Sequence, residues 1–125
     1  MIQVWHVFES FYDAGKVRKL GISNIYSLDK LKELWNAATI KPSIVQNRFY
    51  EKSHFDVDLR QFCTEKGITY QSFWTLTASR KALATQGIKD LAMKKHLSPQ
   101  TLMYAFVSSF YFVTFFVTSV ANFFW

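Results

Sequence analysis

The stretch Gly15-Lys16-Val17-Arg18-Lys19-Leu20-Gly21-Ile22-Ser23-Asn24 decides the fold that the sequence predicts. Apolar residues recur at helical spacing over 2–14, and the glycine that opens the quoted stretch is a natural end for that helix. A short apolar strand over 17–23 follows and delivers Ser23 and Asn24 to its carboxyl end. In folds with parallel strands and covering helices, ligands bind at that end of the strands. These two polar residues are therefore the first candidates for a binding site.

Two further helix-then-strand units follow the same plan. Alternation at this spacing is typical of parallel strands joined by crossover helices, so the sequence predicts an α/β fold. Both predicted strands are apolar on both faces, as expected for a sheet that is covered by helices. The predicted elements are helices over 28–38 and 56–66, strands over 43–49 and 68–74, and a short helix over 88–96.

Composition narrows the class of protein. The chain has 125 residues, a formal net charge of +6 and 13 phenylalanines, which suits one domain, or part of a larger one, with an ample core. The basic residues are dispersed along strand flanks and helix faces, so we predict no binding of nucleic acid. No basic segment followed by a short apolar run opens the chain, and no secretory signal is expected.

The single cysteine and the three histidines show no catalytic or metal-binding pattern. Cys63 falls among the apolar positions of a predicted helix, which indicates a small core residue and no disulfide within the chain. We expect surface or packing roles for His6, His54 and His96. Their spacing from the cysteine and the carboxylates is not typical of metal ligands, so no metal is expected.

Three motifs, in order along the chain, carry a resemblance to a known family. They are Asp13-Ala14-Gly15-Lys16-Val17-Arg18 with Gly21-Ile22-Ser23-Asn24, then Lys41-Pro42 with Val45-Gln46-Asn47-Arg48-Phe49, then Phe62-Cys63-Thr64-Glu65-Lys66-Gly67-Ile68 with Gln71-Ser72-Phe73-Trp74-Thr75-Leu76. Together they resemble the aldo-keto reductases over about residues 4–114, and the second and third motifs look most like fungal members.

The resemblance implies part of a (β/α)8 TIM barrel. The chain would start in the fourth helix of the barrel and carry strands five, six and seven. We therefore expect about three parallel strands with flanking helices, plus an apolar C-terminal helix or strand. The function implied is NADPH-dependent reduction of carbonyl compounds in the cytoplasm, with NADP(H) and a small carbonyl substrate as ligands. A full barrel needs about 250 residues, and the exposed strand edges of a partial one favour self-association.

The resemblance also implies six cofactor-binding residues. Ser23, Asn24 and Gln46 match positions that hydrogen-bond the nicotinamide carboxamide, for which hydroxyl and amide groups supply donors and acceptors. Phe73 matches the aromatic residue that stacks under the nicotinamide ring, and Leu76 and Thr77 match the loop that passes the cofactor pyrophosphate. Without the resemblance, the Ser-Asn pair is also a common turn and the phenylalanine a common core residue. The candidates are Ser23, Asn24, Gln46, Phe73, Leu76 and Thr77.

The catalytic region of the family is absent from the sequence. The family's catalytic Asp, Tyr, Lys and His lie on its first four strands, which precede the part that this chain resembles, so we assign no catalytic residue. The chain is therefore expected to be a reductase by family that is inactive by itself. The alternative is a non-catalytic, truncated product that associates with a membrane through its C-terminal segment.

Residues 104–125 contain no charged residue. We therefore expect two parts, a partial reductase domain over 1–103 and an apolar C-terminal segment over 104–125. Three interpretations of this segment stay open. It can hold the last barrel strand over 112–117, form a transmembrane helix, or be a tail that a misplaced exon boundary added. Ser98-Pro99 is a strong helix start, and the absence of Gly and Pro beyond it favours a helix that continues past Ser109.

Overall fold

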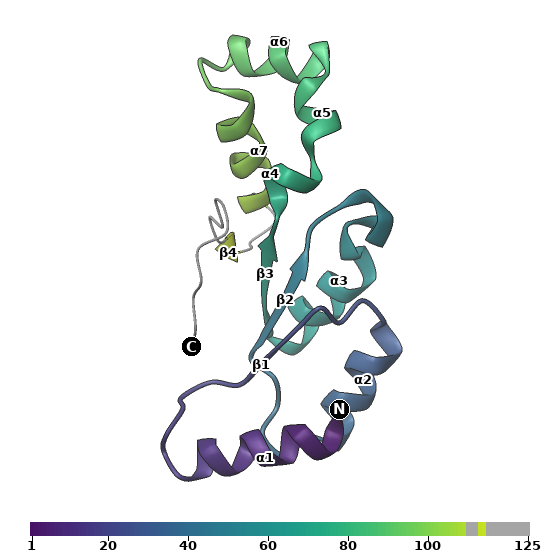
Figure 1. The fold of residues 1–125 in the computed structure, drawn as a ribbon, viewed down its shortest axis with the longest axis vertical. Helices are drawn as coiled ribbons and strands as arrows, with labels where there is room; N and C mark the ends of the chain where they lie inside the picture. Colours follow the sequence, from purple (N-terminus) through teal and green to yellow (C-terminus); the bar gives the residue numbers. More distant parts are fainter. Residues whose placement is uncertain (110–112, 115–125) are drawn as a thin grey trace.

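The computed structural model describes residues 1–109 and 113–114 of the chain. In this part the strands form one parallel sheet in the order β1-β2-β3-β4, and their carboxyl ends point toward α4, which lies above β3 in Figure 1. The strands are β1 (Gly21–Ser23), β2 (Ile44–Arg48), β3 (Thr69–Phe73) and β4 (Val113–Thr114). The helices are α1 (Ile2–Asp13), α2 (Leu28–Ala37), the 3-10 helix η1 (Glu51–Asp56), α3 (Val57–Lys66), α4 (Thr75–Ala78), α5 (Arg80–Ala84), α6 (Gln86–Lys94) and α7 (Pro99–Ser108).

Capping residues mark the beginning of α2 and α7 and the end of α3. The Ser27 hydroxyl accepts a hydrogen bond from the Lys30 backbone N–H at 3.4 Å and caps α2. The Ser98 hydroxyl caps α7 in the same way. Gly67 ends α3 in a left-handed conformation with φ of 68°, which costs a glycine little. These capping residues fix where each of the three helices begins or ends.

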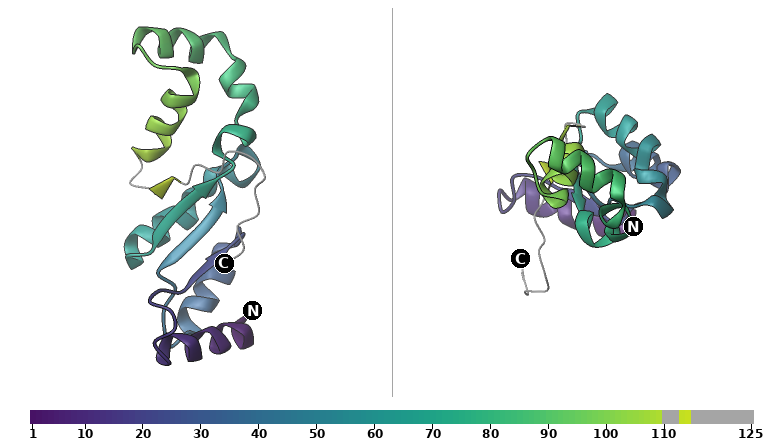
Figure 2. Two further views of the ribbon diagram at one scale, coloured as in Figure 1. Left: turned by 60° about the vertical axis from the view of Figure 1, so that its left-hand side comes forward. Right: turned by 90° about the horizontal axis from the view of Figure 1, so that it is seen from above.

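The core lies between the sheet and the pair α2 and α3. Leu31 of α2, Val45 of β2 and Cys63 of α3 are almost fully buried in one cluster, and Figure 2 shows both helices on the same side of the sheet. Burial raises the pKa of the Cys63 thiol to about 12, because the thiolate would lose its hydration. The prediction that this cysteine is a small core residue is confirmed.

Helix α1 is docked at the amino end of the sheet by polar contacts. The Trp5 indole donates to the Ile40 carbonyl at 3.0 Å. One oxygen of the Glu9 carboxylate accepts from the backbone N–H groups of Thr39 and Ile40, and the other lies 2.7 Å from His6 Nδ1. The bond to His6, followed by those backbone donors, lowers the pKa of Glu9. His6 therefore has a structural contact with its own helix.

The first strand is shorter than predicted. Its ladder with β2 begins at Gly21, opposite Ile44, and not near residue 17. One residue upstream, the Ser43 N–H donates to the Leu20 carbonyl at 2.9 Å. Pro42 directly precedes Ser43, a place that suits proline because it cannot donate to a strand ladder.

The prediction of a helix that continues past Ser109 is wrong. Helix α7 ends at Ser108, and Val113–Thr114 pairs in parallel with Gln71 and Ser72 of β3. This pairing fits the interpretation in which the last barrel strand lies here, and the predicted division between 103 and 104 falls inside α7. Within the described part of the chain, the helices are too short or too polar to cross a bilayer. The rest of the candidate transmembrane segment, 110–112 and 115–125, lies outside the described residues.

We predict that Gly21→Ala destabilises the fold by about 1–3 kcal/mol through overpacking. A Cβ on Gly21 would lie 2.9 Å from the Ile44 Cβ and 3.0 Å from its carbonyl oxygen. The matched control is Gly87→Ala on α6, where a Cβ meets no atom within 4 Å and a helical alanine is favoured by about 0.5–1 kcal/mol. Urea denaturation should give a lower midpoint for the first variant. An unchanged or higher midpoint for Gly21→Ala would contradict the close approach of the strands.

Candidate functional site

Strand register places three polar side chains next to one another across the sheet. Ser23 pairs with Gln46, and Gln46 pairs with Gln71. Register partners in a parallel sheet face the same side, and this is the side opposite to the core helices. A pocket of about 240 Å³ lies over these side chains and is also lined by Gly21 and Ile44. The sequence predicted Ser23 and Gln46 as site residues and missed Gln71.

The Gln46 carbonyl ties the end of β1 to β2. It accepts one hydrogen bond from the Ser23 hydroxyl at 2.8 Å and one from the Asn24 backbone N–H at 3.0 Å. Asn24 reaches this position with φ of 58°, a left-handed conformation that asparagine tolerates better than most residues. The Gln46 side chain donates through Nε2 to Gln71 Oε1 at 3.1 Å. This contact supplies the partner that a half-buried amide needs.

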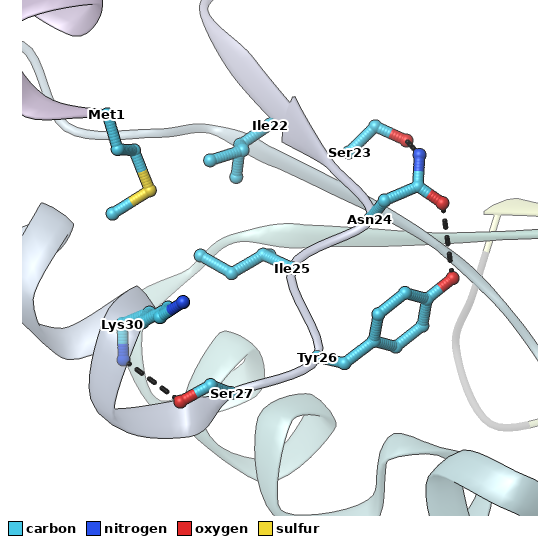
Figure 3. A pocket seen from close by; sticks show the side chains of 8 residues that line it. All are labelled: Met1, Ile22, Ser23, Asn24, Ile25, Tyr26, Ser27 and Lys30. Atoms are coloured by element: carbon cyan, nitrogen blue, oxygen red, sulfur yellow. Dashed lines mark hydrogen bonds between the residues drawn. The ribbon is translucent and has the colours of Figure 1, made fainter.

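The side-chain orientation of Asn24 follows from the direction of its hydrogen bonds (Figure 3). The Ser23 hydroxyl proton is used on a carbonyl, so its oxygen accepts from Asn24 Nδ2 at 3.0 Å. Asn24 Oδ1 then faces the Tyr26 hydroxyl, which donates to it at 3.2 Å. That phenol oxygen also accepts from the Arg48 backbone N–H at 3.3 Å. The side-chain amide of Asn24 is therefore held between Ser23 and Tyr26. The sequence analysis did not single out Tyr26.

Ser23, Asn24 and Gln46 form a hydrogen-bonded row, and this row has free hydrogen-bonding capacity that matches an amide ligand. One N–H on each of Asn24 and Gln46, and the Gln46 Oε1, have no hydrogen-bond partner among the described residues. A primary carboxamide offers one acceptor oxygen and two N–H donors, so the two sets are complementary. A second pocket, of about 570 Å³, extends from Ser23 and Asn24 toward Met1 and Lys30 (Figure 3).

The remaining candidates lie further toward the carboxyl edge. Phe73 ends β3, is half-buried, and pairs in register with Arg48, two residues beyond Gln46 on the same face. Leu76 and Thr77 lie on α4, and Thr77 lines a separate pocket with residues that follow β2. The structure thus joins Ser23, Asn24 and Gln46 by hydrogen bonds. Phe73 lies on the same face of the sheet, one pair of residues closer to the carboxyl edge. Leu76 and Thr77 lie apart from these residues, on α4. Their assignment to a cofactor stays a prediction.

A buried asparagine on the core side holds the turn that follows β1 in place. Asn47 is fully buried, accepts from the Ile25 N–H at 3.0 Å and donates to the Ile25 carbonyl at 2.7 Å. It also donates to Asp56 Oδ2 at 2.8 Å. An asparagine inside an apolar strand is the sequence signal that identifies such a residue, because a buried amide needs several partners. Asn47 is therefore a positioning residue for the turn that carries Asn24.

Asp56 connects this network to a strained turn. His54, Phe55 and Asp56 all have positive φ, near 50°, which costs roughly 1–2 kcal/mol for each residue that is not glycine. The Tyr70 hydroxyl donates to the same Asp56 oxygen at 2.7 Å. Burial, and then this hydrogen bond, raise the pKa of Tyr70, so the phenol keeps its proton and stays a donor. Two buried donors thus hold the turn after β2 in its strained conformation.

Comparison with known proteins places the chain in a family. The sequence model of the Aldo/keto reductase family matches residues 1–123, nearly the whole chain. The chain belongs to the aldo/keto reductase family. The glyoxal reductase of Bacillus subtilis (strain 168) is 30% identical over 94 residues, which cover 75% of this chain and 33% of that protein. The chain therefore spans about a third of the length of this curated relative.

Solved structures confirm the predicted fold. The aldose reductase from Schistosoma japonicum superposes with a TM-score of 0.78 at 16% identity, covering 90% of this chain and 36% of that one. A mutant of Gox0644 in complex with NADPH gives 0.76 at 19% identity, with 90% and 41% covered. The parallel sheet and its helices are therefore part of the barrel of this family, as the resemblance implied.

We predict that Asn47→Ala lowers the free energy of unfolding by at least about 2 kcal/mol. Both backbone groups of Ile25 lose a buried partner, and each unsatisfied group costs roughly 1–3 kcal/mol. Urea denaturation measures the loss. Asn36→Ala, at an exposed position on α2, is the matched control and should stay within about 0.5 kcal/mol of the wild type. Equal midpoints for the two variants would contradict the anchoring role of Asn47.

Proposed function

We propose that this chain is the nicotinamide-binding part of an NADPH-dependent carbonyl reductase. The observation that carries the proposal is the hydrogen-bonded row of Ser23, Asn24 and Gln46, whose free donors and acceptor match a carboxamide. Membership of the aldo/keto reductase family supports the class of reaction. The complex of the Gox0644 mutant with NADPH supports the choice of cofactor, since that protein shares this fold.

Each residue has a distinct task in this proposal. Asn24 donates its free N–H to the carboxamide oxygen, while Gln46 Oε1 accepts from the carboxamide nitrogen. The Phe73 ring, one register row above and half-buried, supports the face of the nicotinamide ring. The reduced nicotinamide supplies a hydride when it is bound. The protein residues orient the ring so that one of its faces points away from the sheet, toward the substrate.

Reduction also requires a proton at the carbonyl oxygen. A positioned acid typically contributes about 10²–10⁴-fold to such a step. None of the six candidate residues is an acid at neutral pH, so we expect this chain by itself to bind the cofactor without turning over a carbonyl substrate. Loss of NADPH absorbance with a reactive aldehyde, above a control without protein, measures turnover.

We predict that Asn24→Ala and Gln46→Ala each weaken NADPH binding about five- to tenfold, the value of one hydrogen bond of roughly 1 kcal/mol. Isothermal titration calorimetry on the full chain gives the dissociation constants. Asn36→Ala removes an exposed amide on α2 and should leave the affinity unchanged. Phe73→Tyr should retain binding because it keeps the ring face, whereas Phe73→Leu should lose it.

Two results would contradict this proposal. The first is the absence of saturable NADPH binding by the wild-type chain. The second is an affinity that falls as much in Asn36→Ala as in Asn24→Ala and Gln46→Ala, since that would place the binding outside the row.

A further inference from the structure

The sheet has an open edge at each end of its strand order. Within the described residues, β1 pairs with β2 alone and β4 pairs with β3 alone. Such edges carry backbone groups that readily pair with another chain. Because all four strands are parallel, a strand that continues the sheet at either edge is expected to run in the same direction.

The open edge of β1 presents the backbone groups of two residues. The Asn24 N–H donates to the Gln46 carbonyl at 3.0 Å, so Asn24 turns its backbone groups toward β2. In a parallel sheet, successive residues of a strand turn these groups alternately to one side and to the other. Ile22 therefore also faces β2, whereas the N–H and C=O of Gly21 and Ser23 point toward the open edge.

The open edge of β4 is complementary to that of β1. The Thr69 N–H donates to the Ser43 carbonyl at 2.9 Å, so Thr69 faces β2, and alternation along β3 turns Ser72 toward β4. In a parallel pair of strands, only one of two register partners turns its backbone groups to the other strand. Thr114, the register partner of Ser72, therefore presents its N–H and C=O to the open edge.

One face of the sheet also lacks a covering layer in the described part of the chain. Along β2 and β3, residues that face the core helices are buried, and those on the other face are half-buried. Parallel sheets are normally covered on both faces. A single added strand would pair one edge and leave this face uncovered. Closure into a barrel removes both edges and packs the inner face against itself.

We propose that two copies of this chain close an eight-stranded parallel barrel, with β4 of each copy beside β1 of the other. Eight is the number of strands in a parallel barrel of this kind, and two four-stranded sheets supply it. A two-fold axis relates the two junctions, so the arrangement is closed. The two rows of Ser23, Asn24 and Gln46 then lie at the same end of the barrel, because all eight strands point one way.

The distribution of charge favours this pairing of edges. The exposed basic residues Lys16, Arg18 and Lys19 precede β1, whereas residues 104–125, which include β4, carry no charge. A junction of β1 with β4 therefore brings no like charges together. A junction between two β1 strands would place the basic residues of both copies at one edge, which like-charge repulsion disfavours. The proposal concerns strand edges and does not depend on the nicotinamide site.

The first test is sedimentation equilibrium of the full chain without cofactor. We expect an equilibrium between monomer and dimer with no larger species, because a closed barrel has no edge left to pair. A chain that stays monomeric up to the concentrations that NMR requires would overturn the proposal. Assemblies that keep growing with concentration would also contradict it, since they would show edges that pair without closing.

The second test removes one donor from the open edge of β4. Thr114→Pro deletes the outward N–H and spares the bonds to β3, a place where an edge strand tolerates proline. Both junctions lose a hydrogen bond, so the dissociation constant of the dimer should rise at least about tenfold. Thr114→Val keeps the N–H and is the matched control, which should dimerise like the wild type. Equal dissociation constants for the two variants would refute the junction.

The third test needs no substitution and follows amide hydrogen exchange by NMR. The Ile22 N–H bonds to β2 in monomer and dimer alike, whereas those of Gly21 and Ser23 gain a partner only in the dimer. We expect exchange at Gly21 and Ser23 to slow as the dimer forms, while exchange at Ile22 is slow throughout. A dimer in which Gly21 and Ser23 still exchange rapidly would rule out pairing through β1.

Discussion

Two hydrogen bonds converge on the carbonyl oxygen of Gln46, and the arrangement of the site depends on them. They come from the Ser23 hydroxyl and the Asn24 backbone N–H, and they fix the end of β1 against β2. The Ser23 proton is thereby committed, which forces the Asn24 amide to turn its oxygen toward Tyr26. A backbone constraint of the sheet thus sets the direction of side-chain donors at its surface. Pre-organisation of this kind reduces the conformational entropy that the protein loses when a ligand binds.

The two faces of the sheet carry polar side chains with different surroundings. On the core side, Asn47 and Tyr70 hold the loops after β1 and β2 through buried hydrogen bonds. On the opposite side, Ser23 and Gln46 line a pocket with their polar groups. Alternation along a strand makes neighbouring residues face opposite ways, so Gln46 faces the candidate site while Asn47 faces the core helices. This division is why a pair of amides can stand in the middle of an otherwise apolar strand.

Much of this architecture could be predicted from the sequence because local chemistry determines it. Ser27, Gly67 and Ser98 mark helix ends by capping, and the helix-strand alternation implies parallel strands. The role of Gln71 could not be predicted, since it depends on register between strands distant in sequence. The position of the Tyr26 hydroxyl also depends on a distant segment, because it accepts from the Arg48 backbone N–H. The end of α7 at Ser108 also escaped prediction, because no Gly or Pro marks it and pairing of Val113–Thr114 with β3 competes with helix propensity.

The central claim is that the row of Ser23, Asn24 and Gln46 binds the carboxamide of a nicotinamide. Titration with reduced nicotinamide riboside, which carries no phosphate, tests it most directly when the side-chain amide signals are followed by NMR. The account predicts saturable shifts for the NH₂ signals of Asn24 and Gln46, while that of Asn36 on α2 stays in place. Shifts confined to other amides, or no saturable shift at Asn24 and Gln46, would contradict the claim.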